Sequence, residues 1–208
     1  MFGTLYIVSA PSGVGKTSLL HNICANKLIC DITLSISYTT REMRLGEFHK
    51  KHYFFVSKQK FKDMIRNNFF LEYAKVFDNY YGTSKAEIRD FLSSGMDVLL
   101  DIDWQGAQQI RYSVPNSCSI FIFPPSIKEL NRRLYRRKKD DKIIIKKRML
   151  QAVKEMNHYM EYDYLIFNDC FDVALRDLRI IIESERLRVD RQKLFHGNLI
   201  KELLKKLN

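Results

Sequence analysis

The stretch LYIVSAPSGVGKTSLL, Leu5 to Leu20, decides the fold. It opens on the apolar run LYIV, which is typical of a strand buried on both faces of a parallel sheet. A glycine-rich turn follows, and Lys16 and Thr17 then lead into a helix. Gly13 and Gly15 let backbone N–H groups converge on phosphate oxygens, and the N-terminus of the helix adds its positive end. Strand, loop and helix in this order predict a phosphate-binding loop.

Three side chains give this loop its chemistry. Lys16 can reach the β- and γ-phosphates of a nucleotide, and the hydroxyl of Thr17 can bind Mg²⁺. Asp101 ends the apolar run of LLDID and can hold the same ion through water. We therefore predict a Mg²⁺ site at Thr17 and Asp101. The predicted ATP site contains Ala10, Pro11, Ser12, Gly13, Val14, Gly15, Lys16 and Thr17. Among these, only Ala10 departs from the usual pattern, which has Gly there.

The remaining apolar runs predict the rest of an α/β domain. Runs without polar alternation occupy residues 5–9, 97–102, 119–123 and 164–167. Helical stretches lie between them, and two begin with a capping box: Ser84 with Glu87, and Ser126 with Glu129. Strands that alternate with helices imply a layered fold with a parallel sheet. A chain of 208 residues is the size of one such domain.

Two segments stand apart from this alternation. Residues 33–76, with the short runs TLSISYTTR, HYFFV and FLEYAKV, predict short strands around one helix, and we interpret them as a small insert. The C-terminal tail carries apolar residues at helical spacing: Ile200, Leu203, Leu204 and Leu207. The tail packs either on the core or on a second copy of the chain, so a homo-oligomer stays open.

Charge and cysteines limit the classes of function. The net charge is +11, and residues 132–148 alone carry +8, with ten Lys or Arg and two Asp. This stretch is a solvated helix face, a nucleic-acid site or a cationic flap over a polyphosphate. A nucleic-acid site would favour interleaved aromatic residues, and Tyr135 is the one aromatic residue of the stretch, which disfavours that alternative. The four cysteines have no metal-ligand spacing, and no apolar run approaches the roughly 18 residues of a membrane span. We expect a cytoplasmic protein with reduced thiols, without nucleic acid or membrane as partner.

A second anion site is predicted in the insert. Arg41 and Arg44 are three residues apart in TTREMRLGE, where two guanidinium groups can grip one phosphate through paired donors. Tyr53 and Tyr81 offer hydroxyl donors to the same group. A GTPase would carry the guanine-binding pattern N-K-x-D, which is absent from this sequence. The chain therefore has the residues to bring two phosphate groups together.

In these residues and the motifs around them, the chain resembles the guanylate kinases, and most closely those of bacteria. The resemblance rests on TLYIVSAPSGVGKTSLL, TTREMRLGE, HYFFV, FLEYAKVFDNYYGTS, DVLLDIDWQGAQQIR, FIFPPS and AVKEMNHYMEYDYLIFND, and it extends from Gly3 to Arg188. It implies a three-layer P-loop NTPase core (domain 3–183) with a mixed α/β GMP-binding insert at about 35–96 and a helical lid at about 126–150. A helical tail follows at 184–208.

The resemblance also implies an activity and a set of site residues. The expected reaction is Mg²⁺-dependent transfer from ATP to GMP, and also to dGMP, in the recycling of guanine nucleotides. The GMP phosphate would be held by Arg41, Arg44, Tyr53 and Tyr81, and the guanine by Ser37, Glu72, Thr83 and Asp103. The catalytic set would be Lys16 and Arg41 with the lid arginines Arg133, Arg137 and Arg148, and Asn168 would lie near the adenine.

The sequence departs from the family pattern at four places. Besides Ala10, Met43 and Leu45 stand where prolines are common. The lid has Arg-Arg-Lys at 136–138 where Gly-Arg-Gly is frequent, and Cys170 replaces an aspartate. None of these changes removes a charged group that the chemistry needs.

Glu72 supplies a physical reason for guanine. A carboxylate accepts from N1–H and N2–H together, whereas adenine presents a bare N1 lone pair at that place. The simpler interpretation is an ion pair between Glu72 and a neighbouring Lys or Arg at a strand edge. Three other functions stay open: a kinase for another nucleoside monophosphate, an inactive protein-interaction module of this fold, and a nucleic-acid-dependent ATPase. Lys16, Arg41 and Arg44 argue against the inactive module.

Overall fold

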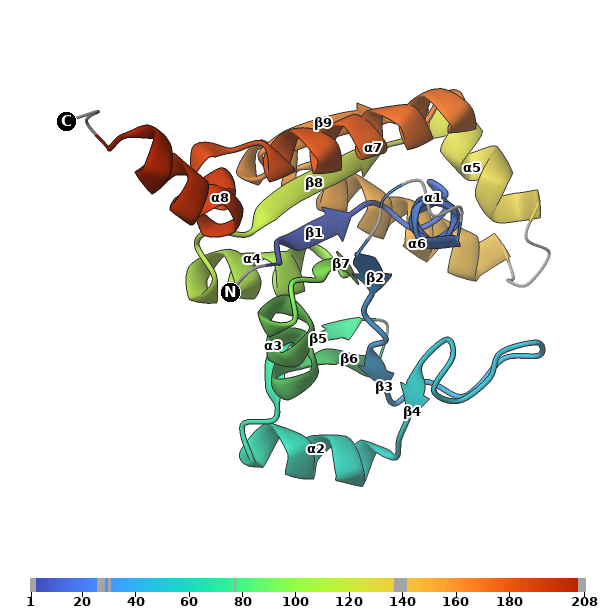
Figure 1. Ribbon diagram of the computed structural model, residues 1–208. Helices are drawn as coiled ribbons and strands as arrows, with labels where there is room; N and C mark the ends of the chain where they lie inside the picture. The colour runs from blue at the N-terminus through green and yellow to red at the C-terminus, as the bar shows by residue number, and fades with distance from the viewer. Residues whose placement is uncertain (1–2, 26–28, 30, 77, 137–141, 206–208) are drawn as a thin grey trace.

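The computed structural model describes residues 3–25, 29, 31–76, 78–136 and 142–205 (Figure 1). Its centre is a sheet of five strands in the order β2-β7-β1-β8-β9, and every neighbouring pair is parallel. The strands are β1 (Leu5–Ser9), β2 (Ile32–Leu34), β7 (Asp97–Asp101), β8 (Cys118–Phe123) and β9 (Tyr164–Phe167). Parallel order requires crossover connections, and helices supply them.

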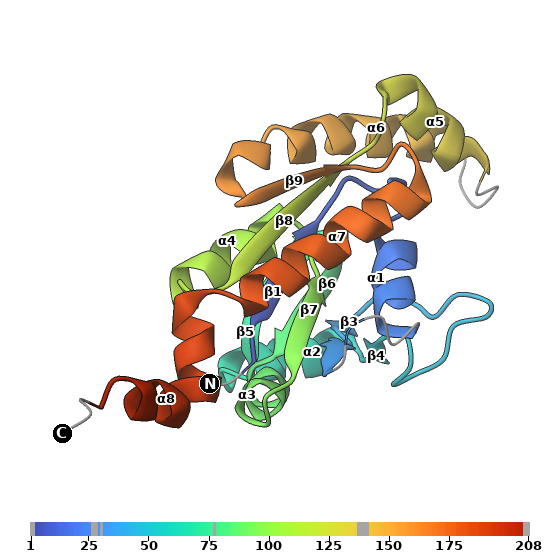
Figure 2. The same cartoon turned by 45° about the horizontal axis from the view of Figure 1, so that its top comes forward.

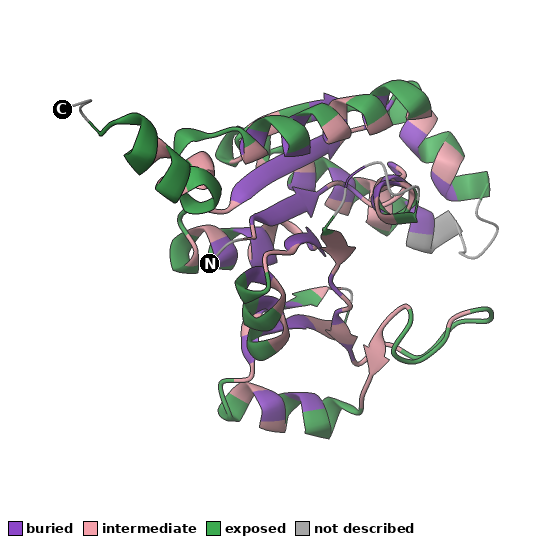
Figure 3. Cartoon of the chain, viewed as in Figure 1, coloured by how far each residue is buried: buried purple, intermediate pink, exposed green. Residues whose placement is uncertain are grey.

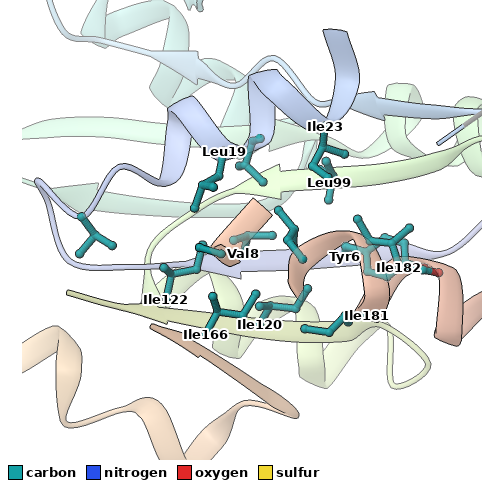
Figure 4. Packing of buried hydrophobic residues seen from close by; sticks show 14 of the residues in the cluster. Tyr6, Val8, Leu19, Ile23, Leu99, Ile120, Ile122, Ile166, Ile181 and Ile182 are labelled. Carbon is teal, nitrogen blue, oxygen red and sulfur yellow. The ribbon is translucent and has the colours of Figure 1, made fainter. Parts of the chain in front are cut away.

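Helices cover both faces of this sheet, so the core has three layers. The helices α1 (Lys16–Ala25) and α7 (Phe171–Arg186) pack on one face, against Tyr6 and Val8 (Figure 4). The helices α3 (Lys85–Ser93) and α4 (Trp104–Ser113) pack on the other, against Leu5 and Ile7. Successive strand residues face opposite layers, and all four are buried, which explains why the strand sequence shows no polar alternation.

A second, smaller sheet lies below the core in Figure 1. Its order is β4-β3-β6-β5, with β3–β4 parallel and the other pairs antiparallel. The elements are β3 (Tyr38–Thr39), β4 (Phe54–Phe55), α2 (Lys58–Arg66), β5 (Phe70–Val76) and β6 (Asn79–Ser84). Phe61 and Met64 of α2 pack with Phe70 of β5, so this sheet has a small apolar core of its own.

The remaining helices lie at the edges of the core. The helices α5 (Ile127–Arg136) and α6 (Lys142–Met156) are neighbours at one end (Figure 2), and the short helix η1 (Tyr159–Glu161) follows them. The last helix, α8 (Val189–Leu203), has no buried residue (Figure 3). It is tied to the core by Arg191, which with Arg186 of α7 pairs with the buried Asp97.

Most of the predicted elements are confirmed. The four apolar runs are β1, β7, β8 and β9, and the hydroxyls of Ser84 and Ser126 accept from the N–H of Glu87 and Glu129 at the starts of α3 and α5. The α/β fold with a parallel central sheet is confirmed as well.

Two assignments were wrong. The run that begins at Thr33 was placed wholly in the insert, but Ile32–Leu34 is the edge strand of the core sheet and only Tyr38–Thr39 belongs to the second sheet. A half-buried edge strand of three residues has too little pattern to be recognised. Strand β6 was also missed, because its sequence NYYGTS is polar and aromatic and contains no apolar run. At the C-terminal end, α7 continues to Arg186, past the expected start of the tail at 184.

Candidate active site

One cavity of about 530 Å³ opens between the core sheet and the second sheet. The phosphate loop forms one wall, the second sheet the opposite wall, and the turn after β7 the floor; α6 closes one side. The predicted residues that line it are Ala10, Pro11, Ser12, Gly13, Gly15, Lys16, Thr17, Ser37, Arg41, Arg44, Tyr53, Glu72, Tyr81, Asp101, Asp103 and Arg148. The structure thus brings together the residues expected at both anion sites.

The phosphate loop has the backbone that its glycines allow. Gly13 and Gly15 have φ angles of 101° and 105°, a region that disfavours residues with a Cβ. Ala10 is not among the described residues with positive φ, so an alanine fits at that position without strain. Lys16 lies under the loop, where its Nζ contacts Oδ1 of Asp101 at 2.7 Å and the carbonyl oxygen of Ile102 at 2.8 Å. The lysine is therefore already turned toward the end of β7.

Thr17 and Asp101 converge as a Mg²⁺ site requires. The hydroxyl of Thr17 donates to Oδ2 of Asp101 at 3.0 Å, so two oxygen ligands lie side by side at the mouth of the phosphate loop. Mg²⁺ prefers oxygen ligands and usually takes only one or two from protein, with water and substrate phosphates filling the rest. These two residues fit that donor set.

Arg41 is held in place by four neighbours, one of which is the carbonyl oxygen of Glu42 at 2.7 Å. Its guanidinium group donates to Oε1 of Glu47 at 2.8 Å and lies over the rings of Tyr53 and Phe55, 5.3 Å and 5.7 Å from their centroids. Glu47 also accepts from the backbone N–H of Arg44 at 2.8 Å. One carboxylate therefore fixes the side chain of one arginine and the backbone of the next.

Tyr53 and Tyr81 are neighbours with ring centroids 6.1 Å apart. Burial, helped by the negative charge of Asp101, raises the pKa of Tyr53 well above its usual value. Its hydroxyl therefore remains protonated in the working pH range and can donate to a phosphate oxygen.

Glu72 is the deepest charged group of the cavity, with 3% of its surface exposed. Burial, helped by the nearby Asp103, raises its pKa to about 7, although a hydrogen bond from Thr83 favours the ionised form. The hydroxyl of Thr83 lies 2.5 Å from Oε1. Glu72 forms no ion pair with any of the described residues, so the simpler interpretation of a strand-edge ion pair has no support there.

The residues around Glu72 leave space for its carboxylate group. A Cβ on Gly106 would lie 2.5 Å from Oε2 of Glu72, so only glycine fits at that position of α4. Asp103 caps the same helix: its Oδ1 accepts from the N–H of Gly106 at 3.1 Å. Ser37, which is buried, completes the predicted guanine set at the cavity wall.

Arg133 and Asn168 lie on the other side of the phosphate loop. They line a second, smaller pocket with Gly13 and Gly15. Arg133 donates to the carbonyl oxygens of Val14 at 2.9 Å and Asn168 at 3.2–3.3 Å, and the Asn168 amide donates to Val14 at 2.7 Å. Two of the predicted lid arginines therefore lie at different pockets. Arg133 supports the loop from behind and Arg148 lines the main cavity, while Arg137 lies outside the described residues.

Three residues of this site were missed from the sequence. Glu47 holds both arginines, and its position three residues after Arg44 was a usable signal. Glu155 lines the main cavity from α6, and it lies seven residues after Arg148, on the same helix face. Gly106 had no signal, because its role depends on a close approach between α4 and β5.

Comparisons with known proteins show the family to which the chain belongs. The guanylate kinase family model matches residues 3–185. The guanylate kinases of Escherichia coli K12 and Sodalis glossinidius are each 58% identical to the chain over 202 residues, which is 97% of this chain and 98% of each relative. The chain belongs to the guanylate kinase family. The crystal structure of a guanylate kinase from Anaplasma phagocytophilum has 32% identity and a TM-score of 0.75, with 95% of each chain covered.

Membership of the guanylate kinase family confirms the resemblance and the predicted class of enzyme, a kinase that acts on a nucleoside monophosphate. The departures from the family pattern at Met43 and Leu45 lie in an exposed loop, where their exposed fractions are 57% and 101%. No helix in the described part of the chain is long and apolar enough to cross a membrane.

Proposed function

We propose that this protein transfers the γ-phosphoryl group of ATP to GMP, and to dGMP as a second acceptor, to give ADP and a guanosine diphosphate. The observation that carries the proposal is the single cavity that the phosphate loop and the residues Arg41, Arg44 and Glu72 line together. Phosphoryl transfer needs two anions held in line while their charge is neutralised, and this cavity offers one cationic site for each.

The donor side binds ATP through the phosphate loop. Backbone N–H groups of residues 13–17 and the N-terminus of α1 receive the phosphates, and Lys16 exchanges its contact with Asp101 for a phosphate oxygen. The pocket behind the loop, with Asn168 and Phe171, receives the adenosine end. Arg133 acts from there by holding the carbonyl groups of Val14 and Asn168, so that the loop keeps its shape.

The acceptor side needs no general base. The phosphate group of a monoester loses its second proton with a pKa of about 6, so an oxygen of GMP is already a nucleophile at neutral pH. Arg41, Arg44, Tyr53 and Tyr81 hold that phosphate by donating to its other oxygens. The attacking oxygen forms a bond to the γ-phosphorus while the bond to the ADP oxygen breaks, and Arg148 at the side of the cavity stabilises the charge that develops.

Glu72 sets the choice of base. It is buried between Thr83 and Gly106, so a purine that enters must pair with the carboxylate. Guanine offers two adjacent donors and stabilises the ionised form, which lowers the raised pKa of Glu72 on binding. Ser37 and Asp103 take the remaining edge. Adenine would leave the carboxylate unpaired. The free-energy cost of that unpaired state disfavours AMP relative to GMP.

The cofactor we propose is Mg²⁺, held by Thr17 directly and by Asp101 through water. When bound, this ion neutralises charge on the β- and γ-phosphates during transfer. Asp101 orients Lys16, and its hydrogen bond with Thr17 joins the phosphate loop to the end of β7.

The partners we propose are ATP and GMP, in the cytoplasm, without nucleic acid or membrane. A nucleic-acid-dependent ATPase would hydrolyse ATP without GMP, and a kinase for another monophosphate would not need a buried carboxylate at the base. Whether the exposed α8 packs on a second copy is left to a measurement of molecular mass in solution.

The test is ADP production from ATP and Mg²⁺ with GMP, dGMP, AMP, CMP, UMP and dTMP offered in turn. GMP should give the highest kcat/KM, dGMP the next, and AMP a value lower by about 10⁴. ADP formed at the full rate without any acceptor, or a preference for another monophosphate, would overturn the proposal.

A further inference from the structure

Glu155 is a buried acid that the proposed reaction does not use. It lies in the last two turns of α6, with 7% of its surface exposed, and it lines the main cavity beside Ser12 and Lys16. Few carboxylates are buried to this extent without a task or a partner. A buried carboxylate beside a loop that binds anions needs a physical explanation.

The groups that Glu155 faces across the cavity are those that would receive a phosphate group. It shares the cavity wall with Ser12 and Lys16, and the backbone of Ser12 and the positive charge of Lys16 both favour its ionised form. Gln151, one turn earlier on α6, donates to Oε1 at 3.4 Å. Burial, helped by the negative charge of Asp103, raises the pKa of Glu155 to about 7, although Lys16, Gln151 and Ser12 favour the ionised form. The carboxylate thus stands in for an anion at the phosphate loop.

The same helix carries a charge of the opposite sign. Arg148 lines the cavity seven residues before Glu155, which is two helical turns or about 10 Å along one face. The two side chains move together because they belong to one continuous helix. Phosphates at the loop would attract the arginine and repel the glutamate, so the two charges together favour a tilt of α6 that brings Arg148 closer and moves Glu155 away.

We propose that Glu155 is a positioning residue that holds α6 against the empty phosphate loop and is displaced by the phosphates of ATP. The inference rests on the proposed binding of ATP at this loop. Its consequence is that the position of α6, and with it Arg148, depends on whether the loop is occupied. Part of the binding free energy of ATP is then used to break the contact that Glu155 makes.

The chain holds a natural reporter of this displacement. Trp104, its one tryptophan, stacks on His158 with ring centroids 3.9 Å apart and planes 7° apart. His158 follows α6 by two residues, so a shift of α6 changes the stack and with it the emission of Trp104. This signal does not depend on catalysis.

The test compares Glu155→Gln, which keeps the shape and removes the charge, with the wild type at pH 8. A non-hydrolysable ATP analogue with Mg²⁺ should bind the variant about fivefold more tightly or better, while the dissociation constant of GMP stays the same. Trp104 emission of the empty variant should already be shifted part of the way toward that of the ATP-loaded wild type. Equal or weaker binding of the analogue, or an unshifted emission, would overturn the inference.

Two matched controls separate charge from structure. Gln151→Leu removes the neighbouring donor on the same helix and keeps the charge, so it should not tighten ATP binding; equal tightening would overturn the inference. Glu183→Gln removes a carboxylate that is paired with Arg179 on the exposed side of α7 and should change neither affinity. If the wild type itself fails to bind the analogue, or binds it unchanged after Lys16→Met, it is the proposed function that fails.

Discussion

Oγ1 of Thr83 lies 2.5 Å from Oε1 of Glu72, across the hairpin of β5 and β6. The two residues are direct partners in the strand register, so the sheet itself sets their distance. The hydroxyl occupies one carboxylate oxygen and leaves the other toward Gly106 and the cavity. A buried carboxylate with one neutral donor is incompletely satisfied, and a purine with two donors on one edge completes it.

The affinity for GMP should rise with pH through 7. Because the pKa of Glu72 is raised to about 7 in the empty site, the carboxylate that guanine needs is mostly neutral at pH 6 and mostly charged at pH 8. We expect the dissociation constant of GMP to fall about tenfold over this interval. Titration of Glu72→Gln separates this effect from the second proton of the GMP phosphate, and an identical pH profile in that variant would contradict the role of Glu72.

The stability of the empty protein should show the reverse dependence. A carboxyl group whose pKa is raised in the folded state stabilises it fully below the unfolded value, near 4.5, and loses that contribution as pH rises through the folded value, about 7. Glu72→Gln should therefore gain free energy of unfolding relative to the wild type between pH 5 and pH 8. Urea unfolding at both pH values measures it, and a constant difference would refute the buried, unpaired state of Glu72.

Lys16→Met should stop transfer without unfolding the chain. The side chain contributes a charge at the mouth of the loop, and methionine keeps its length without that charge. We expect kcat to fall about a hundred- to a thousandfold, with the melting temperature nearly unchanged. Lys62→Met, at an exposed position of α2, is the control. A variant at position 16 that keeps even about a third of the normal rate would count against the assignment.

Arg41→Lys should weaken GMP without weakening ATP. The guanidinium group is planar, bonded to Glu47 and stacked over Tyr53, and an ammonium group can reproduce neither the paired donors nor the stack. We expect the KM for GMP to rise about tenfold and the KM for ATP to stay the same. The same exchange at Arg66, an exposed residue of α2, serves as the control. An equal rise in both KM values would show that Arg41 is structural.

Asp97→Ala should destabilise the fold and spare the chemistry. Asp97 is 1% exposed, and it joins β7 to Arg186 and Arg191 at 2.8 Å and 3.1 Å. Removing it leaves two partly buried guanidinium groups without their carboxylate, at a cost of about 3–5 kcal/mol. It lies at the opposite end of β7 from Asp101, so kcat per folded molecule should be unchanged. A loss of kcat at full stability would contradict this separation.

The sequence predicted the strands of the core sheet that carry a continuous run of three or more apolar residues and misplaced the core strand that does not. The strands that contain Tyr6, Leu99 and Ile120 are apolar throughout because helices cover both faces of the sheet. The edge strand at Ile32–Leu34 is only half-buried, so no periodicity marks it.

The site shows the same limit. Lys16, Thr17 and the arginine pair follow from local spacing, and the distant Glu72 followed only from the resemblance. What spacing could not supply is contact between distant elements: Gly106 leaves space for Glu72, and Arg133 supports the phosphate loop from behind. Each depends on how two segments far apart in the chain pack together.

The kcat/KM ratio of GMP to AMP for Glu72→Ala, beside the wild type, tests the central claim most directly. The wild type should prefer GMP by about 10⁴ or more, since adenine leaves a buried carboxylate unpaired. Glu72→Ala should raise the KM for GMP steeply and narrow the ratio, while the KM for ATP stays nearly unchanged. A variant that keeps the full preference for GMP would contradict the account and would move base selection to another residue, with Asp103 the first to examine.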